Sequence, residues 1–256
     1  MLRKHLIEKG IRTSNGFRMR GGEVTRIEGF TDAVFAFAVT LLIVSLEVPK
    51  TFSELLEIMQ GLAAFAICFA MLIQVWHYHY VFFRRYGLQD GYITTISSIL
   101  LFVVLFYIYP LKFVFTFVVR GILHGFEQYV QLPDGTQALV VERSQGSTMM
   151  IIYGIGFIAV FLLLALLYYH AYRRRRELDL NELEIFDTKA SIQAFSIQVG
   201  VGIISVMIAT IGGLYYWFAG MAYFLIGPAL GFHGARTGKK RKKLVALIDS
   251  QRQDKE

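Results

Sequence analysis

The sequence predicts an all-α, polytopic membrane protein with six transmembrane helices and both termini in the cytoplasm. Its 256 residues are 55% hydrophobic, with a mean hydropathy of +0.50, which is more apolar than a typical soluble domain. The charged residues gather between long apolar runs instead of being spread along the chain. This pattern is typical of proteins that cross a membrane repeatedly.

Six apolar windows are candidate transmembrane spans. Each is about as long as, or longer than, the roughly 20 residues that one crossing needs. They cover 30–48, 55–83, 92–119, 149–171, 190–211 and 214–232. The second and third windows are longer than one crossing, so we expect those helices to tilt or to project from the bilayer. Only Gly212 and Gly213 are left for the turn between the last two spans.

The basic residues cluster on one side of this topology. Of the 26 Lys and Arg residues, 22 lie before the first span, between the second and third, between the fourth and fifth, or after the sixth. Cytoplasmic segments carry such an excess of positive charge. The distribution therefore predicts that both termini lie in the cytoplasm.

These assignments divide the chain into a basic N-terminal segment (1–25), a six-helix domain (26–235) and a basic tail (236–256). An external loop at 120–147 interrupts the domain, and Pro133-Asp134-Gly135 predicts a turn between two short β-prone runs there. The tail contains "GKKRKK" at 238–243, which we interpret as a contact with membrane lipids and not with nucleic acid. Cys68 is the only cysteine, which excludes intrachain disulfides and thiolate metal clusters built from a single chain.

Asp32 needs an explanation because a charge inside a membrane is costly and normally faces protein or water. One interpretation is that Thr31 and Asp32 cap the N-terminus of the first helix. The other is a hydrogen-bonded girdle that joins Asp32 to polar groups at the same depth: Arg26, Trp76, His77 and His79. The two histidines, two positions apart, point to different faces of a helix and make a poor metal site. The cluster also lacks the nucleophile and base of a catalytic site, so we expect neither an enzyme nor a cofactor.

Thr40, in the middle of the first span, also admits two interpretations. Its hydroxyl can bond back to the carbonyl of Ala36, as threonines in membrane helices often do. It also belongs to a stripe at helical spacing, formed by Phe37, Thr40, Leu41 and Val44. Such a stripe suits a pore axis surrounded by several copies of the helix, and equally suits packing inside one bundle.

Several motifs are absent from the sequence. No segment matches a "TVGYG" carbonyl filter, and there is no Walker loop, which argues against an ATP-driven pump. No internal repeat is evident, which weakens the case for an inverted-repeat transporter.

The stretch "RIEGFTD" at 26–32 resembles the R-x-x-x-F-S-D signature of the endosomal and lysosomal potassium channel family of transmembrane proteins. Thr31 stands where the family most often has serine and keeps the hydroxyl. "WHYHY" at 76–80 resembles the family's Trp/His segment at the end of the second helix. Pro110, late in the third span, also fits the family.

The resemblance implies a potassium-selective channel that assembles as a homotetramer in a prokaryotic plasma membrane, with potassium ions and lipids as its other partners. The first helix would line the pore, with an apolar constriction in place of a carbonyl filter. Thr40 would form a hydroxyl ring, and the candidates for the constriction are Phe37, Leu41 and Val44. The signature residues that would fix the pore helix are Arg26, Phe30, Thr31 and Asp32.

Two alternatives remain at this point. A proton-coupled secondary cation transporter could use Asp32 and His79 as titratable groups, because a histidine titrates near neutral pH. A membrane-embedded enzyme or scaffold would explain a static polar cluster, but no catalytic constellation supports it. A transporter saturates and responds to a proton gradient, whereas a pore carries current without one.

Overall fold

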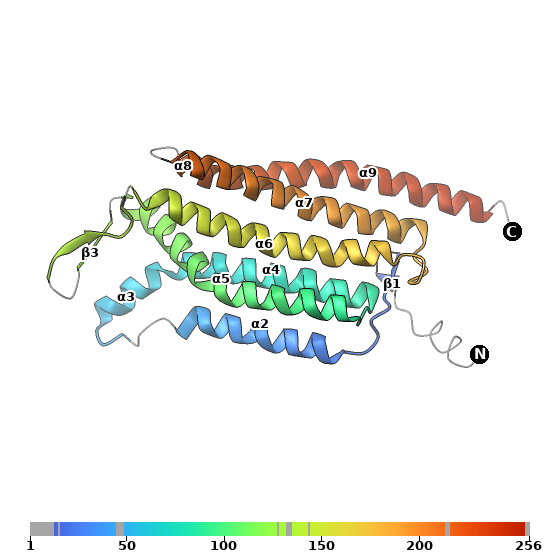
Figure 1. Cartoon of the computed structure of the whole chain (residues 1–256), viewed down its shortest axis with the longest axis horizontal. Helices are drawn as coiled ribbons and strands as arrows, with labels where there is room; N and C mark the ends of the chain where they lie inside the picture. The colour runs from blue at the N-terminus through green and yellow to red at the C-terminus, as the bar shows by residue number, and fades with distance from the viewer. Residues whose placement is uncertain are drawn as a thin grey trace.

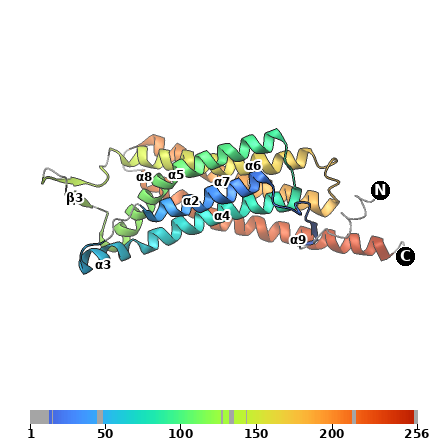
Figure 2. The same ribbon diagram turned by 90° about the horizontal axis from the view of Figure 1, so that it is seen from below.

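The computed structural model describes residues 13–14, 16–44, 49–126, 128–131, 135–142, 144–212 and 216–253. It is an elongated bundle of long helices that lie side by side (Figure 1). Across the bundle, α2 packs on α4 and α5, then α6 follows, then α7, and α9 packs on α7. Helices α2 and α9 therefore lie at opposite edges in Figure 1, and the view from below shows the same long helices running along the bundle (Figure 2).

The long helices are α2 (Arg26–Val44), α4 (Leu62–Tyr86), α5 (Gly91–His124), α6 (Gly146–Arg173), α7 (Glu182–Ile211) and α9 (Ile226–Gln253). Shorter elements join them: α3 (Phe52–Gln60), α8 (Tyr216–Met221) and the 3₁₀ turn η2 (Ala222–Leu225). Among the described residues, five helices are long and apolar enough to cross a membrane: α4, α5, α6, α7 and the run Tyr216–Ile248. Helix α2 lies beside them and carries three charged residues in its first two turns: Arg26, Glu28 and Asp32.

The observed helices differ from the predicted windows at their ends. The second window is broken at Gly61 into α3 and α4, so its extra length is a separate short helix. Helix α9 runs unbroken across the predicted boundary at 235/236 into the basic tail. A hydropathy window ends where the apolar residues end. A helix can continue further, because charged residues with high helix propensity keep its backbone hydrogen bonds.

Helix α6 is the centre of the bundle and packs against α5 on one side and α7 on the other. Close approach depends on glycine here. A Cβ on Gly156 would lie 2.2 Å from ring atoms of Tyr107 in α5, and one on Gly202 of α7 would lie 2.6 Å from Ile158. The Tyr107 hydroxyl donates to the carbonyl oxygen of Tyr153 at 2.6 Å, which satisfies a buried polar group between the two helices.

Two small hairpins mark opposite ends of the bundle. Strands β3 (Tyr129–Gln131) and β4 (Gln137–Leu139) pair antiparallel, with Val130 opposite Ala138. This confirms the hairpin predicted in the loop at 120–147, although Pro133 and Asp134 of its turn lie outside the described residues. Strands β1 (Thr13–Ser14) and β2 (Phe17–Arg18) form a second hairpin that the sequence did not predict.

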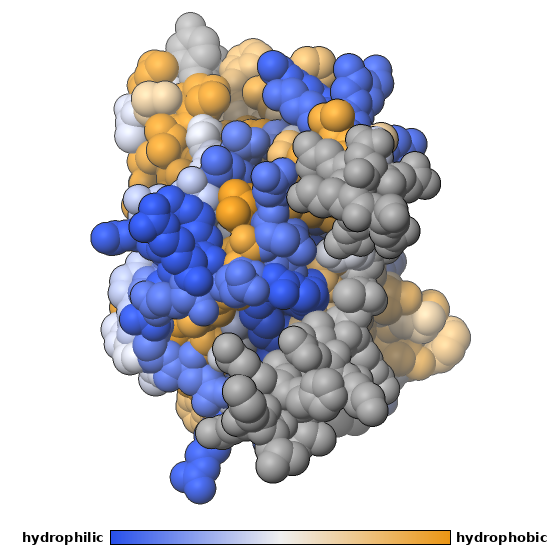
Figure 3. Space-filling model, turned by 90° about the vertical axis from the view of Figure 1, so that its right-hand side faces the viewer, coloured by the Kyte–Doolittle hydropathy of each residue, from blue (hydrophilic) through white to orange (hydrophobic). Residues whose placement is uncertain are grey.

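We refer to these as the hairpin end (β3 and β4) and the arginine-rich end, which holds β1, β2, the loop at 173–176 and the end of α9. Figure 3 looks onto the arginine-rich end, where hydrophilic residues cover much of the described surface. At this end Asp90 caps α5 by accepting from the backbone N–H of Ile93 at 2.9 Å. Asp90 also contacts His170 at 2.8 Å and Arg174 at 3.0 Å, which ties the beginning of α5 to the end of α6.

Candidate functional site: helix α2 and its anchors

Helix α2 begins with a capping box at Thr25 and Glu28. The Glu28 backbone N–H donates to Thr25 Oγ1 at 3.2 Å, and the Thr25 N–H donates to Glu28 Oε2 at 3.3 Å. This reciprocal pair satisfies two backbone donors that a helix N-terminus leaves free. The interpretation of Thr31 and Asp32 as N-caps is therefore wrong: α2 begins six residues before Asp32, and Thr31 Oγ1 donates within the helix to the Ile27 carbonyl at 2.7 Å.

Glu28 is also the anchor between α2 and α4, a role that the sequence interpretation missed. Its side chain is 3% exposed and forms an ion pair with Arg84, whose Nε lies 3.0 Å from Glu28 Oε1. Arg84 also donates to the Gly21 carbonyl at 2.9 Å, while the Gly21 N–H donates to the Arg84 carbonyl at 3.0 Å. The T-x-x-E spacing of Thr25 and Glu28 is a capping-box signal in the sequence.

Asp32 and Trp76 form a second link between the same two helices. Trp76 Nε1 donates to Asp32 Oδ1 at 2.8 Å, and the indole stacks on Tyr80 at a centroid distance of 5.5 Å. The guanidinium of Arg84 lies over Tyr80, 5.5 Å from the ring centroid, so the Asp32 link and the Glu28 link meet on one face of α4. A charge-assisted hydrogen bond of this kind fixes the rotation of one helix against another.

The other predicted members of the girdle lie elsewhere. His79 is 1% exposed and contacts Ser97 Oγ of α5 at 3.0 Å, with the Phe35 ring of α2 at 6.5 Å. His77 projects from a different side of α4, toward α7 and α9. Arg26 is exposed and has no hydrogen bond or ion pair with any residue that the structure describes. The predicted cluster is thus divided among four surroundings.

Helix α2 has one buried side and one open side. Its buried side consists of Glu28, Thr31, Phe35, Ala38 and Leu42, each 4% exposed or less. The open side contains Phe30 at 58%, Phe37 at 56% and Ile43 at 49% exposed, and also Ala33, Ala36 and Thr40. Thr40 lies between Phe37 and Ile43 on the helical wheel and occupies the middle of the open side.

The predicted stripe is therefore only partly on the open side. Leu41 is half-buried, and the side chain of Val44 lies outside the described residues. Ile43 is on the open side although we did not select it from the sequence; its spacing of three residues from Thr40 is the signal that points to it. Thr40 Oγ1 donates to the Ala36 carbonyl at 3.0 Å. Because a hydroxyl has two acceptor lone pairs, this bond leaves both of them available on the open side.

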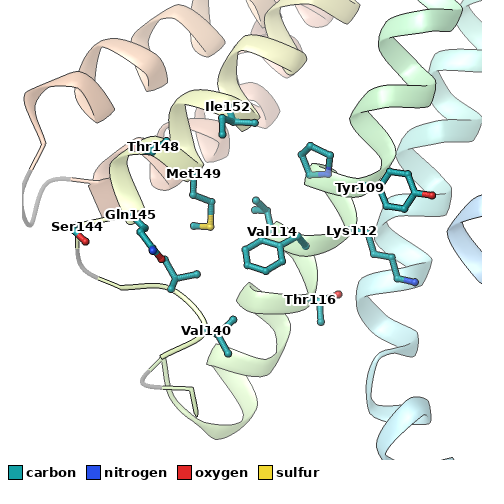
Figure 4. A pocket seen from close by; sticks show the side chains of 13 residues that line it. Tyr109, Lys112, Val114, Thr116, Val140, Ser144, Gln145, Thr148, Met149 and Ile152 are labelled. Carbon is teal, nitrogen blue, oxygen red and sulfur yellow. The ribbon is translucent and has the colours of Figure 1, made fainter. Parts of the chain in front are cut away.

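The far end of α2 is held by Lys112 of α5, whose Nζ donates to the Leu42 carbonyl at 3.0 Å. Carbonyls in the last turn of a helix lack partners within the helix, and a cation there also opposes the helix dipole favourably. Figure 4 shows a cavity beside this part of α5, of about 840 Å³, in which Met149 and Val114 face each other while Lys112 projects from α5 away from Met149. Pro110 lines the same cavity.

Residues before α2 form a strap, defined here as 16–25, that crosses the arginine-rich end. Phe17 is 1% exposed and meets Tyr86 edge-on at 5.7 Å. Arg18 and Arg20 both bond the buried carboxylate of Glu184 in the first turn of α7; the Arg20 Nη2 to Oε2 distance is 2.7 Å. The hydrogen bond to Glu184 raises the pKa of Arg18 above its ordinary value against the opposing effect of burial. Glu184 also completes a capping box with Asn181.

Within the described part of the chain, no three His, Cys, Asp or Glu side chains come close enough together to hold a metal ion. The site consists of a half-open helix with a central hydroxyl, anchored to its neighbours at both ends. Such an arrangement can present one face to an axis shared with other subunits or to a water-filled path, and it has no reacting groups aligned for catalysis.

Comparisons with known proteins agree with this geometry. The sequence profile of the family described as "Endosomal/lysosomal potassium channel TMEM175" matches residues 26–107, which include α2 and its anchors on α4 but not Lys112 of α5. A protein from Marivirga tractuosa named "Potassium channel" is 38% identical over 248 residues, spanning 94% of this chain and 99% of the relative. A potassium channel from Chamaesiphon minutus is 32% identical over 96 residues, which are 34% of this chain and 47% of that protein.

Two solved structures resemble the fold. The crystal structure of a threonine-to-alanine variant of the potassium channel MtTMEM175, in complex with a nanobody–MBP fusion protein, has a TM-score of 0.75 at 38% identity and covers 90% of this chain and all of that one. The crystal structure of a lysosomal potassium-selective channel TMEM175 homologue from Chamaesiphon minutus has a TM-score of 0.51 at 22% identity, covering 83% and 96%. This chain is a membrane protein with several apolar helices, and it belongs to the TMEM175 potassium channel family, whose members are channels and not enzymes.

Proposed function

We propose that the chain is a potassium-selective, homotetrameric channel whose pore is lined by the open side of α2. The observation that carries the proposal is that Phe30, Phe37 and Ile43 are about half exposed on the same side of the helix as Thr40. In a single chain this leaves a hydroxyl and large apolar groups without protein neighbours. Around a four-fold axis, four copies of this side would face one another and enclose a narrow path.

In this assembly Thr40 supplies oxygen to a passing cation and the apolar neighbours narrow the path. The two free lone pairs of each Thr40 hydroxyl replace part of the ion's hydration shell, while Phe37, with Leu41 or Val44, excludes further water. A constriction of apolar side chains alone would exclude ions by dewetting. The cost of removing water from potassium is smaller than for sodium, so a ring of few oxygens favours potassium.

The proposed orientation places the arginine-rich end in the cytoplasm and the chain in the plasma membrane. Four arginines (173–176) and the basic segment of α9 lie at this end together with the strap, and the positive-inside rule then sets the direction of every helix. Asp32, Trp76 and Arg84 would hold the cytoplasmic end of α2 in register with α4, and Arg26 would be free to contact a second subunit. No cofactor is required beyond the permeating ions.

The test is current through the purified protein in a planar bilayer, with potassium on one side and sodium on the other. A channel gives a reversal potential near the potassium equilibrium value without a proton gradient. A proton-coupled cation transporter would instead give a saturable flux that requires the gradient. Absence of current from intact tetramers would overturn the channel proposal.

Thr40→Ala tests the hydroxyl ring. We expect the potassium-to-sodium permeability ratio to fall about ten-fold, which corresponds to about 1.4 kcal/mol in relative barrier height, while the tetramer still conducts. Thr40→Ser keeps the hydroxyl and should keep most of the ratio. The matched control is Thr210→Ala, since Thr210 is an exposed threonine of α7 that also bonds its own helix backbone, at 2.7 Å. An unchanged ratio in Thr40→Ala would remove Thr40 from the filter.

A further inference from the structure

A second cavity lies in the arginine-rich half of the bundle, between α4, α6, α7 and α9. Its stripe on α4 lies next to the stripe that carries the links to α2, and the His77 ring is 6.4 Å from the Tyr80 ring. The volume of the cavity is about 240 Å³, somewhat below the ~300–1,000 Å³ typical of sites for drug-sized ligands. Helix α4 contributes His77, Val81 and Arg85, which lie four residues apart on one stripe. Helix α7 contributes the stripe Ser191, Ala194, Phe195 and Gln198. We call this space the interhelical cavity.

Gln198 is the first group that lacks a partner. Its side chain lines the interhelical cavity, it is only 5% exposed, and it makes no hydrogen bond with any described residue. Its primary amide has two donors and an acceptor, and none of them bonds to a described residue. Its position on the cavity wall means that a ligand can supply the missing bonds.

Arg85 is the second such group. The half-buried guanidinium lies over the Phe17 ring, 4.9 Å from its centroid, and has no carboxylate partner in the described part of the chain. Glu28 and Asp187 form ion pairs with other arginines: Glu28 with Arg84, and Asp187 with Arg241 at 2.9 Å. The five N–H donors of Arg85 are therefore available to an anion.

The other residues that line the cavity indicate which chemical group can be bonded to the anion. Ser191 already donates its hydroxyl proton to the Asp187 carbonyl at 3.1 Å and so adds no free donor, while His77 adds a ring nitrogen to the cavity wall. Val81, Ala194, Phe195 and Leu230 make the rest of the wall apolar. A cation, an amide and an imidazole from two helices line this one cavity and can donate to the several oxygens of a phosphate group, while the apolar wall suits the first carbons of an acyl chain.

We propose that the interhelical cavity binds a phosphate group, with Arg85 and Gln198 as its principal ligands. The phosphate comes either from the headgroup of an anionic phospholipid or from a small soluble phosphate compound, and both sources share these contacts. A phosphate bound there would join α4, α7 and α9. It would lie next to the stripe of α4 that holds α2 through Trp76 and Arg84. The site does not depend on whether α2 lines a pore.

The experiment titrates the full-length protein in detergent by calorimetry with three probes. Dioctanoyl phosphatidic acid carries both phosphate and acyl chains, inorganic phosphate carries only the former, and dioctanoylglycerol carries only the latter. Binding of phosphatidic acid alone identifies a lipid headgroup site, and binding of inorganic phosphate as well identifies a soluble phosphate. Binding of dioctanoylglycerol as tightly as phosphatidic acid would overturn the proposal, because the cavity would then recognise acyl chains.

Gln198→Leu is the decisive variant because it preserves volume while removing the amide. We expect at least a ten-fold loss of affinity for the phosphate-bearing probe, since the amide that would bond the phosphate is removed. Arg85→Gln should cost at least as much affinity. Gln193→Leu is the control, as Gln193 is an exposed residue of α7 whose amide already contacts His233 at 3.2 Å. Unchanged affinity in Gln198→Leu would contradict the assignment.

Discussion

Helix α6 buries side chains along its whole length toward both α5 and α7, whereas α2 buries one side and leaves the other open. Both are apolar helices of a length suited to a membrane, but their polar groups differ. Helix α6 is held by close packing at glycines, and α2 is held at its ends by charges: Glu28 with Arg84 at one end and Lys112 at the other. The more apolar helix is therefore the structural one, while the helix that keeps charges and a hydroxyl is the candidate for function.

The largest expected effect comes from breaking the charged anchor of α2. Glu28→Ala leaves Arg84, which is 16% exposed, without its partner, and we expect the free energy of unfolding to fall by about 3 kcal/mol. Denaturant unfolding of the purified protein in detergent measures it. Glu177→Ala is the control, because Glu177 is 70% exposed and lies 3.7 Å from Arg174; it should cost less than about 1 kcal/mol. Similar losses in both variants would mean that the anchor of α2 is an ordinary surface pair.

A smaller effect is expected from overfilling the packed side of α6. In Gly156→Val the new side chain meets the Tyr107 ring, where even a Cβ would lie at 2.2 Å, and α5 has to move. Overpacking of this kind costs about 1–3 kcal/mol, which thermal unfolding followed by circular dichroism would record. Gly200→Val in α7 introduces the same group where nothing lies within 4 Å and should be neutral or slightly stabilising. If Gly156→Val and Gly200→Val change the unfolding temperature equally, helix propensity and not the close approach of α5 and α6 determines that change.

The smallest effect is expected at the rotational link between α2 and α4. Trp76→Phe keeps an aromatic ring beside Tyr80 but removes the Nε1 donor to Asp32, so we expect a loss of about 1 kcal/mol in unfolding free energy. The same measurement on Trp217→Phe gives the cost of shrinking an indole that packs edge-on against Phe126 at 4.5 Å. An equal loss in both variants would show that the hydrogen bond to Asp32 adds nothing to the contact.

Much of the fold is predictable from the sequence because hydropathy acts on whole segments. Each of the six predicted windows overlaps one or more helices, and the hairpin in the loop at 120–147 was signalled by its turn residues. The ends of helices were less predictable. Gly61 divides one window into α3 and α4, and α9 continues through the basic tail, because local backbone bonding and caps decide where a helix stops.

The candidate site was only partly predictable. Asp32, Trp76 and Thr40 were selected from the sequence, and the structure gives each a defined partner. Glu28 and Gln198 were not selected from the sequence. A glutamate before an apolar run and a glutamine within a helix are common, and only the structure shows that both side chains are buried. His77, His79 and Asp32 do not form one cluster. His77 and His79 are two positions apart on α4, so His79 points to Ser97 of α5 while His77 lines the interhelical cavity.

By itself the sequence determined that this is a helical membrane protein with a strong charge asymmetry and a polar first helix, since apolar length and charge position are properties of the chain. Packing between helices determines which side of α2 is open, which acid holds it, and which of two neighbouring arginines has no carboxylate partner among the described residues. Arg84 and Arg85 are adjacent in the chain, yet one meets Glu28 and the other faces a cavity with Gln198. A helix turns 100° per residue, so the surroundings of adjacent side chains depend on what packs around them.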